Sequence, residues 1–209
     1  METLNYKGFD IEITDEDYPE SPREQWDNLG SIIAWHRNYN LSDKGIDFAE
    51  PEDFEDWLKD NPSIVLPVYM YDHSGISLST GQFSCPWDSG QLGWIFVTKE
   101  KIREEYGVKR ITNKLKGKVI KVLRQEIETY SQYCEGRVYG FIVETDDGEH
   151  IGSCYGFYGE DWEDNGLLEY AQDDIDCYIS TQKENRAKQL KAWIKNKVSL
   201  LKRTPFILV

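Results

Sequence analysis

The stretch IVLPVYMYDHSGISLST, residues 64–80, decides the fold class of this 209-residue chain. Two runs rich in β-branched and aromatic residues, 64–71 and 76–80, flank a turn of composition Asp-His-Ser-Gly, which suits a hairpin. A third run of the same kind follows at residues 93–97. The sequence therefore predicts an antiparallel meander in this part of the chain.

Further strands and helices are expected on both sides of the meander. Alternating or β-rich segments predict strands at residues 7–14, 31–39, 137–144 and 150–155. Apolar residues at helical spacing predict helices at residues 51–59, 99–106, 112–133, 167–178 and 182–203. The order of these elements favours an α+β fold, with a mainly antiparallel sheet, flanking helices and a long basic C-terminal helix.

Local signals predict where some helices begin. Ser21 followed by Glu24 is the pattern of a capping box, with Pro22 at the first helical position, so a short helical turn is expected to end by Gly30. Gly117 weakens the first turn of the helix at 112–133, which is expected to begin properly only at Lys118.

Chain length favours one domain, since domains average about 150 residues. We expect a single α+β domain over residues 1–180 and a basic amphipathic helix over residues 181–209 that packs on the same domain. The N-terminal residues lack the apolar core of a secretory signal, and no apolar stretch is long enough to cross a bilayer. The four cysteines contain no C-x-x-C pair, so we expect reduced thiols, a cytoplasmic protein, no membrane association and no cofactor.

The net charge of −14 is unevenly distributed along the chain. Residues 1–98 and 134–180 carry net charges of −14 and −12, whereas residues 99–133 and 181–209 carry +5 and +7. The acidic total argues against a general binder of the DNA backbone, because phosphate binding requires positive charge at the contact surface. The two basic helices either pack over the acidic remainder or face a partner of their own.

One cluster offers the residue types of an enzyme. His73 and Cys85 face each other across the predicted hairpin, with Asp88 nearby, and a Cys–His pair is the minimum for an activated thiol. No oxyanion-hole or elbow motif accompanies them, so a small enzyme built on this cluster is the weaker alternative. Asp72, His73 and Asp88 could also converge on a metal, but no histidine pair has metal-binding spacing and we expect no metal site.

Acidic residues interleaved with aromatic ones point to a protein interface. Such residues occur around Tyr18 and in the segment 155–164, where a calcium loop is excluded because Gln172 stands in the twelfth position. The expected partner-binding residues are Glu20, Trp26, Asp27, Asp88, Asp161, Trp162, Glu163 and Asp164.

Four sequence blocks add a resemblance to a family. SPREQWDNLG (residues 21–30), DHSGI (72–76), CPWDSGQLG (85–93) and SCYGFYG (153–159) together resemble a family of small acidic proteins carried by phages and plasmids of Gram-positive bacteria. The resemblance implies a mobile-element setting and no particular reaction. Accessory proteins of that setting include anti-CRISPR and anti-restriction inhibitors, so we expect a non-enzymatic inhibitor of a host defence nuclease.

The basic helices support an alternative function. A nucleic-acid-associated protein would use the lysines and arginines of the C-terminal helix, because these residues supply the positive charge that phosphate contacts require. The expected residues are Lys183, Arg186, Lys188, Lys191, Lys195, Lys197, Lys202 and Arg203.

Overall fold

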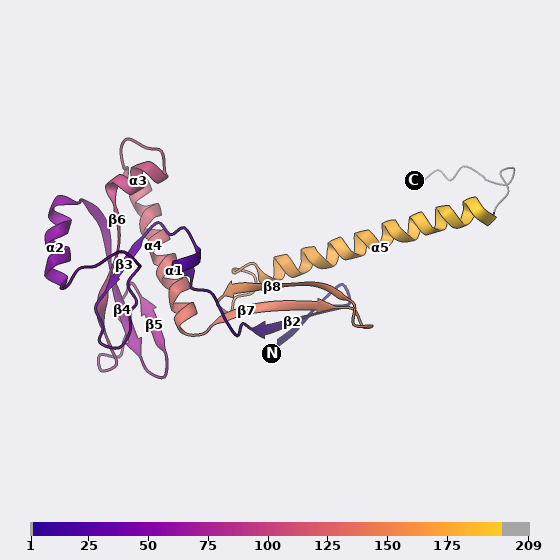
Figure 1. Cartoon of the computed structure of the whole chain (residues 1–209), viewed down its shortest axis with the longest axis horizontal. Helices are drawn as coiled ribbons and strands as arrows, with labels where there is room; N and C mark the ends of the chain where they lie inside the picture. Colours follow the sequence, from indigo (N-terminus) through magenta and orange to yellow (C-terminus); the bar gives the residue numbers. More distant parts are fainter. Residues whose placement is uncertain (1, 198–209) are drawn as a thin grey trace. The chain divides into compact units, whose positions relative to one another are not determined.

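The computed structural model describes residues 2–197 and shows the expected α+β fold (Figure 1). The strands form two four-stranded sheets, ordered β1-β2-β7-β8 and β3-β6-β4-β5. The described residues divide into two units. Unit 1 comprises residues 2–15, 140–157 and 161–197, and unit 2 comprises residues 16–139 and 158–160.

The elements of the described chain follow one another in an irregular order of strands and helices. They are β1 (Glu2–Tyr6), β2 (Phe9–Asp15), α1 (Pro22–Gln25), β3 (Ser31–Ala34), α2 (Pro51–Asp60), β4 (Ser63–Asp72), β5 (Ile76–Ser79), β6 (Ser89–Thr98), α3 (Lys99–Glu105), α4 (Asn113–Cys134), β7 (Val138–Glu144), β8 (His150–Tyr158) and α5 (Leu167–Lys197).

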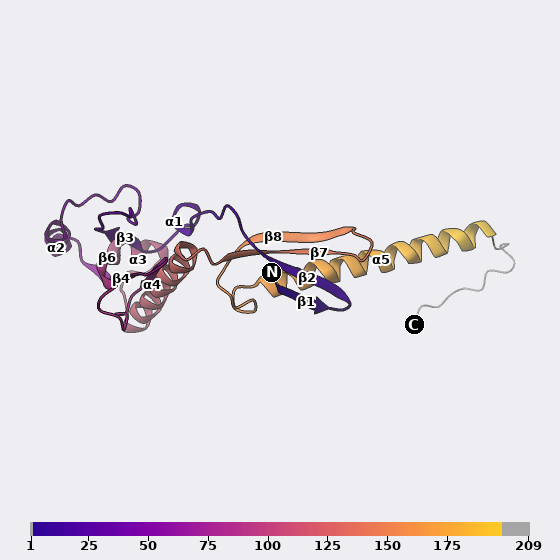
Figure 2. The same cartoon turned by 90° about the horizontal axis from the view of Figure 1, so that it is seen from below.

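Unit 2 is built around the three strands of the predicted meander, with helices on both faces of their sheet (Figures 1 and 2). The meander order itself is wrong, because β6 pairs with β4 instead of β5 and leaves β5 at the edge of the sheet. Successive residues of a strand point to opposite faces, so neighbours in β6 belong to different cores. Ile95 packs in one core with Leu123 and Ile127 of α4, whereas Phe96 packs in the other core with Phe54 of α2. Both faces are therefore buried, which explains the nearly continuous apolar runs of these strands.

Unit 1 packs the first half of α5 against its sheet. Leu167, Ala171 and Ile175 recur at helical spacing and are fully buried. On the sheet, the ring of Phe157 lies 6.0 Å from that of Phe141, and the ring of Tyr170 in α5 lies 5.8 Å from that of Phe157. These contacts form the apolar core of the unit.

Two predicted helix boundaries are wrong. Helix α4 includes Gly117, because the Thr112 side chain caps the helix by accepting a hydrogen bond from the Leu115 amide (3.2 Å), which offsets the cost of about 1 kcal/mol for a glycine. The helices predicted at 167–178 and 182–203 are one helix as far as Lys197, since Ile179, Ser180 and Thr181 weaken a helix without breaking it. Residues 198–203 of that prediction lie outside the described residues.

Three strands differ from their predicted extents. β1 was not expected, since its residues ETLNY show no strong alternation, but it pairs with β2 in register from Glu2 opposite Ile13 to Tyr6 opposite Phe9. β3 ends at Ala34, five residues earlier than predicted, and the rings of His36 and Tyr39 stack on each other 5.0 Å apart in the loop that follows. β6 begins at Ser89 instead of residue 93.

Helix α5 is long but strongly charged in its second half. Over residues 2–197, no helix has both the length and the apolar character needed to cross a membrane. The helix also passes through residue 180 without interruption, so the expected boundary at that position corresponds to no break in secondary structure.

Gly93 allows β3 and β6 to approach closely. It pairs with Ala34, and a Cβ added to it would collide with the carbonyl oxygen of Ile33. We predict that Gly93→Ala lowers the free energy of unfolding, measured in urea, by about 1–3 kcal/mol, because backbone must shift to make room. Gly90→Ala on the same strand has open space and is expected to change it by less than about 0.5 kcal/mol. Equal effects of the two substitutions would contradict this packing.

Candidate functional site

The segment that carries Trp26 and Asp27 begins with the short helix α1. Ser21 caps this helix by accepting a hydrogen bond from the Arg23 amide (3.3 Å), and Pro22 occupies its first turn. The Glu24 carboxylate pairs with Lys44, 2.8 Å from its Nζ. Ser21 therefore caps the helix as predicted, whereas the Glu24 side chain forms an ion pair with Lys44.

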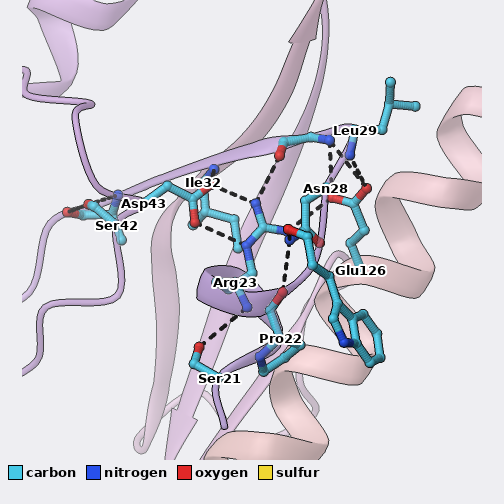
Figure 3. A network of polar contacts seen from close by, with 12 residues as sticks. Ser21, Pro22, Arg23, Asn28, Leu29, Ile32, Ser42, Asp43 and Glu126 are labelled. Carbon is cyan, nitrogen blue, oxygen red and sulfur yellow. Dashed lines mark hydrogen bonds and ion pairs between the residues drawn. The ribbon is translucent and has the colours of Figure 1, made fainter. Parts of the chain in front are cut away.

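A buried arginine ties this segment to distant parts of unit 2 (Figure 3). Nε and Nη2 of Arg23 donate to the two carboxylate oxygens of Asp43 at 3.0 and 2.6 Å, and Nη1 donates to Oε2 of Glu126 at 3.0 Å. Nη2 also donates to the Gly30 carbonyl oxygen at 2.8 Å. The three charged side chains are only 6%, 17% and 12% exposed.

The two carboxylates of this network also accept hydrogen bonds from the backbone. Oε1 of Glu126 accepts from the Leu29 amide at 2.8 Å and, with Oε2, from the Gly30 amide; Oδ2 of Asp43 accepts from the Ile32 amide at 2.8 Å. Burial by itself lowers the pKa of Arg23, but the bonds to Asp43 and Glu126 outweigh it and raise that pKa. The network therefore holds its charges for structure, not for proton transfer.

A polar cavity of about 430 Å³ lies beside this network. The two lysines that line it already have partners, since Lys101 Nζ donates to the Asn28 carbonyl oxygen at 2.8 Å and Lys44 binds Glu24. Tyr130 also lines the cavity, and burial raises the pKa of its hydroxyl well above the ordinary value. These groups support the fold around Arg23 and offer no activated acid or base.

Glu20, Trp26 and Asp27 lie at one edge of unit 2 together with Tyr158. The rings of Trp26 and Tyr158 meet edge to face, 5.1 Å apart, and the Tyr158 hydroxyl donates to the Glu20 carbonyl oxygen at 2.7 Å. Trp26 is 51% exposed, and both acidic side chains are exposed. We call these four residues the Trp26 edge. It presents an aromatic ring and two carboxylates to solvent.

Asp88 lies in a different part of unit 2, where the predicted convergence with His73 and Cys85 is observed. Oδ2 of Asp88 lies 3.7 Å from Nδ1 of His73 and 3.6 Å from Sγ of Cys85. The Cys85 thiol therefore donates to a carboxylate, whereas an activated cysteine needs a histidine that removes its proton. The cluster lacks the arrangement of a thiol nucleophile.

Metal binding and a second cysteine, Cys134, are the two other possible sources of chemistry. Among residues 2–197, no group of three or more histidine, cysteine or acidic side chains is placed to hold a metal ion. This also holds for Asp72, His73 and Asp88. Cys134 is largely buried, and burial, with a smaller effect of Glu135, raises the pKa of its thiol to about 12. This thiol is therefore protonated at neutral pH and a poor nucleophile.

The remaining expected interface residues belong to unit 1. Asp161 forms the turn before α5, since its Oδ1 accepts hydrogen bonds from the amides of Glu163 and Asp164 at 3.2 and 3.0 Å. Trp162 is half-buried and donates through Nε1 to Oε2 of Glu2 at 2.9 Å. The side chains of Asp161, Glu163 and Asp164 are exposed. Within unit 2, Asp88 belongs to a different cluster from Glu20, Trp26 and Asp27.

The basic residues of α5 from Lys183 to Lys197 are exposed to solvent. From Lys183 to Lys197 every residue except Ile194 is exposed, and the exposed fractions of Leu190 and Trp193 are 56% and 58%. Lys202 and Arg203 lie outside the described residues. The positive charge of this segment is therefore presented to solvent.

Comparison with known proteins does not identify a family for this chain. The sequence matches no family model, and no curated protein or solved structure is significantly similar to it. The resemblance of the four sequence blocks to a family therefore stays a prediction.

Sequence reasoning missed Arg23, which organises the Trp26 edge. Its partners are 20 and 103 residues away along the chain, and no local pattern distinguishes it from a solvated arginine. The exposure of Trp87, 89%, was also not expected, because tryptophans are usually core residues.

The network makes a testable prediction about stability. Arg23→Ala leaves two buried carboxylates without a cation, so we expect the free energy of unfolding to fall by about 3–5 kcal/mol in urea denaturation. Lys44→Ala, which breaks an exposed ion pair nearby, is the matched control and is expected to cost at most about 1 kcal/mol. Similar losses for the two variants would show that the Arg23 network does not organise this segment.

Proposed function

We propose that this protein is a mobile-element accessory protein that binds and inhibits a host defence nuclease without catalysing a reaction. The observation that carries the proposal is the exposure of two tryptophans beside carboxylates. Trp87 is 89% exposed next to Asp88, and Trp26 is 51% exposed next to Asp27. Both belong to unit 2.

Exposed tryptophans of this kind fit a binding surface. Removing a large apolar side chain from water is favourable by roughly 1.5–3 kcal/mol, and this free energy is gained only when a partner covers it. Tryptophan is also enriched among the residues that dominate the binding energy of protein interfaces. Trp26 and Trp87 are therefore the expected anchors, with the neighbouring carboxylates at the rim.

The charge supports a basic partner. Unit 2 has 22 acidic and 15 basic residues and therefore a net charge of −7. A nuclease channel that binds phosphates is positively charged, so an acidic surface is attracted to it and competes with nucleic acid. The resemblance to proteins of phages and plasmids supports a defence nuclease as the class of target.

Affinity capture tests this proposal. The full chain is used as bait in extracts of a Gram-positive host that carries active restriction and CRISPR systems, and the captured nuclease is then assayed for cleavage. We predict recovery of a nuclease at about 50 mM salt, inhibition of its cleavage in a 1:1 complex, and weaker capture at about 500 mM salt because the charges are screened.

Variants locate the surface in the same assay. The double variant Trp26→Ala and Trp87→Ala is expected to lower capture at least tenfold, whereas Trp193→Ala, which removes an exposed tryptophan of α5, leaves it unchanged. Absence of any nuclease, or equal capture by the double variant, would overturn the proposal.

A second candidate function rests on the exposed basic side chains of α5. Six of the expected nucleic-acid-binding residues are exposed: Lys183, Arg186, Lys188, Lys191, Lys195 and Lys197. Phosphate contacts require accessible positive charge of this kind. This observation favours a direct contact with nucleic acid alongside the protein partner.

A gel shift with duplex DNA and RNA tests the second candidate. If α5 binds phosphates, affinity falls steeply with salt, and the triple variant Lys183→Glu, Lys188→Glu and Lys191→Glu abolishes the shift. The matched control replaces three exposed lysines of α4, at positions 114, 116 and 121, by glutamate. No shift at low salt, or equal loss with the control, would exclude binding through α5.

A further inference from the structure

A cavity of about 350 Å³ opens beside Trp87 in unit 2. The residues that line it include two tryptophans, Trp35 and Trp87, two aspartates, Asp72 and Asp88, and His36. We infer that this cavity binds an arginine side chain of the protein partner. The inference rests on the proposed function, because it names the chemistry through which the partner is recognised.

One aromatic wall of the cavity is held in place by the fold. Nε1 of Trp35 donates to the Phe48 carbonyl oxygen at 3.0 Å, and its ring meets the ring of Trp94 edge to face at 5.6 Å. Trp87 has no such packing and is 89% exposed. Both tryptophans line the cavity, and a planar guanidinium favours stacking on indole rings.

The two aspartates supply the opposite charge. The Asp72 amide donates to the Asp88 carbonyl oxygen at 2.9 Å, which holds the two residues side by side. The contacts of the Asp88 carboxylate with His73 and Cys85, at 3.7 and 3.6 Å, are longer than strong charged hydrogen bonds. Its oxygens are therefore able to accept the two parallel N–H donors of a guanidinium.

The surroundings leave this charge uncancelled. His36 lines the cavity, His73 contacts Asp88, and Arg37 lines a neighbouring hollow together with Tyr39. Among the residues that the structure describes, no lysine or arginine lines the cavity. An anionic ligand would thus meet two aspartates, whereas a cation is attracted to them and to the two tryptophans.

Arginine fits better than lysine on geometric grounds. Guanidinium is planar, stacks on indole and donates in a fork to a carboxylate, whereas ammonium is a compact and strongly hydrated charge. The volume lies near the lower limit of ligand pockets, which suits one side chain better than a nucleotide. A nuclease channel offers such arginines, since they bind phosphates in the absence of the inhibitor.

The experiment compares two small probes of equal shape. N-acetyl-arginine amide and the corresponding citrulline derivative, which is neutral, are titrated into the full ¹⁵N-labelled chain while the indole N–H resonances are followed by NMR. We predict saturable shifts of the Trp87 and Trp35 resonances with the arginine probe, and at least tenfold weaker binding of citrulline. Trp87→Ala and Asp88→Asn are expected to weaken arginine binding at least tenfold.

Trp193→Ala and Asp60→Asn are the matched controls, because they make the same changes at exposed residues that do not line the cavity and should leave arginine binding unchanged. Equal binding of citrulline, or equal loss with the control variants, would overturn the inference. Nuclease capture separates this result from the proposed function. Capture without arginine binding overturns the cavity alone, and arginine binding without capture overturns the nuclease proposal alone.

Discussion

The ion pairs of Arg23 with Asp43 and Glu126 are the constraint on which the architecture of unit 2 depends. One buried guanidinium connects α1, the start of β3, the loop after β3 and helix α4. Because taking these charges out of water is costly, the network forms only when all its partners are in place. It therefore selects one arrangement of the segment 21–43. This segment contains the exposed Trp26 and the loop that carries Trp35.

The fold class was predictable because its signals are local. Apolar alternation and helical spacing predicted most of the strands and helices, and the Asp-His-Ser-Gly turn correctly placed the β4–β5 hairpin. The position of β6 beside β4 was not predicted. The continuity of α5 and the pairing of β1 were not predictable, since they depend on tertiary contacts that override weak local preferences. The same reason applies to the site. Asp88 reaches His73 because β6 pairs with β4, and Arg23 depends on partners distant in sequence.

The structure shows that charged side chains of both signs are exposed to solvent. The basic residues from Lys183 to Lys197 lie on an exposed helix, so their charge is not buried against an acidic surface. The acidic side chains near Trp26 and Trp87 are exposed as well and stand beside indoles. Charge of both signs is thus available to partners, with aromatic anchors next to the acidic residues in unit 2.

We propose that the acidic and aromatic surfaces of unit 2 bind the protein partner. Hydrogen–deuterium exchange of the full chain, free and in the captured nuclease complex, tests it most directly. We predict that the amides of residues 18–28 and 83–91 are protected in the complex, while those of residues 183–197 exchange as in the free chain. Protection confined to residues 183–197, with residues 18–28 and 83–91 unchanged, would contradict it.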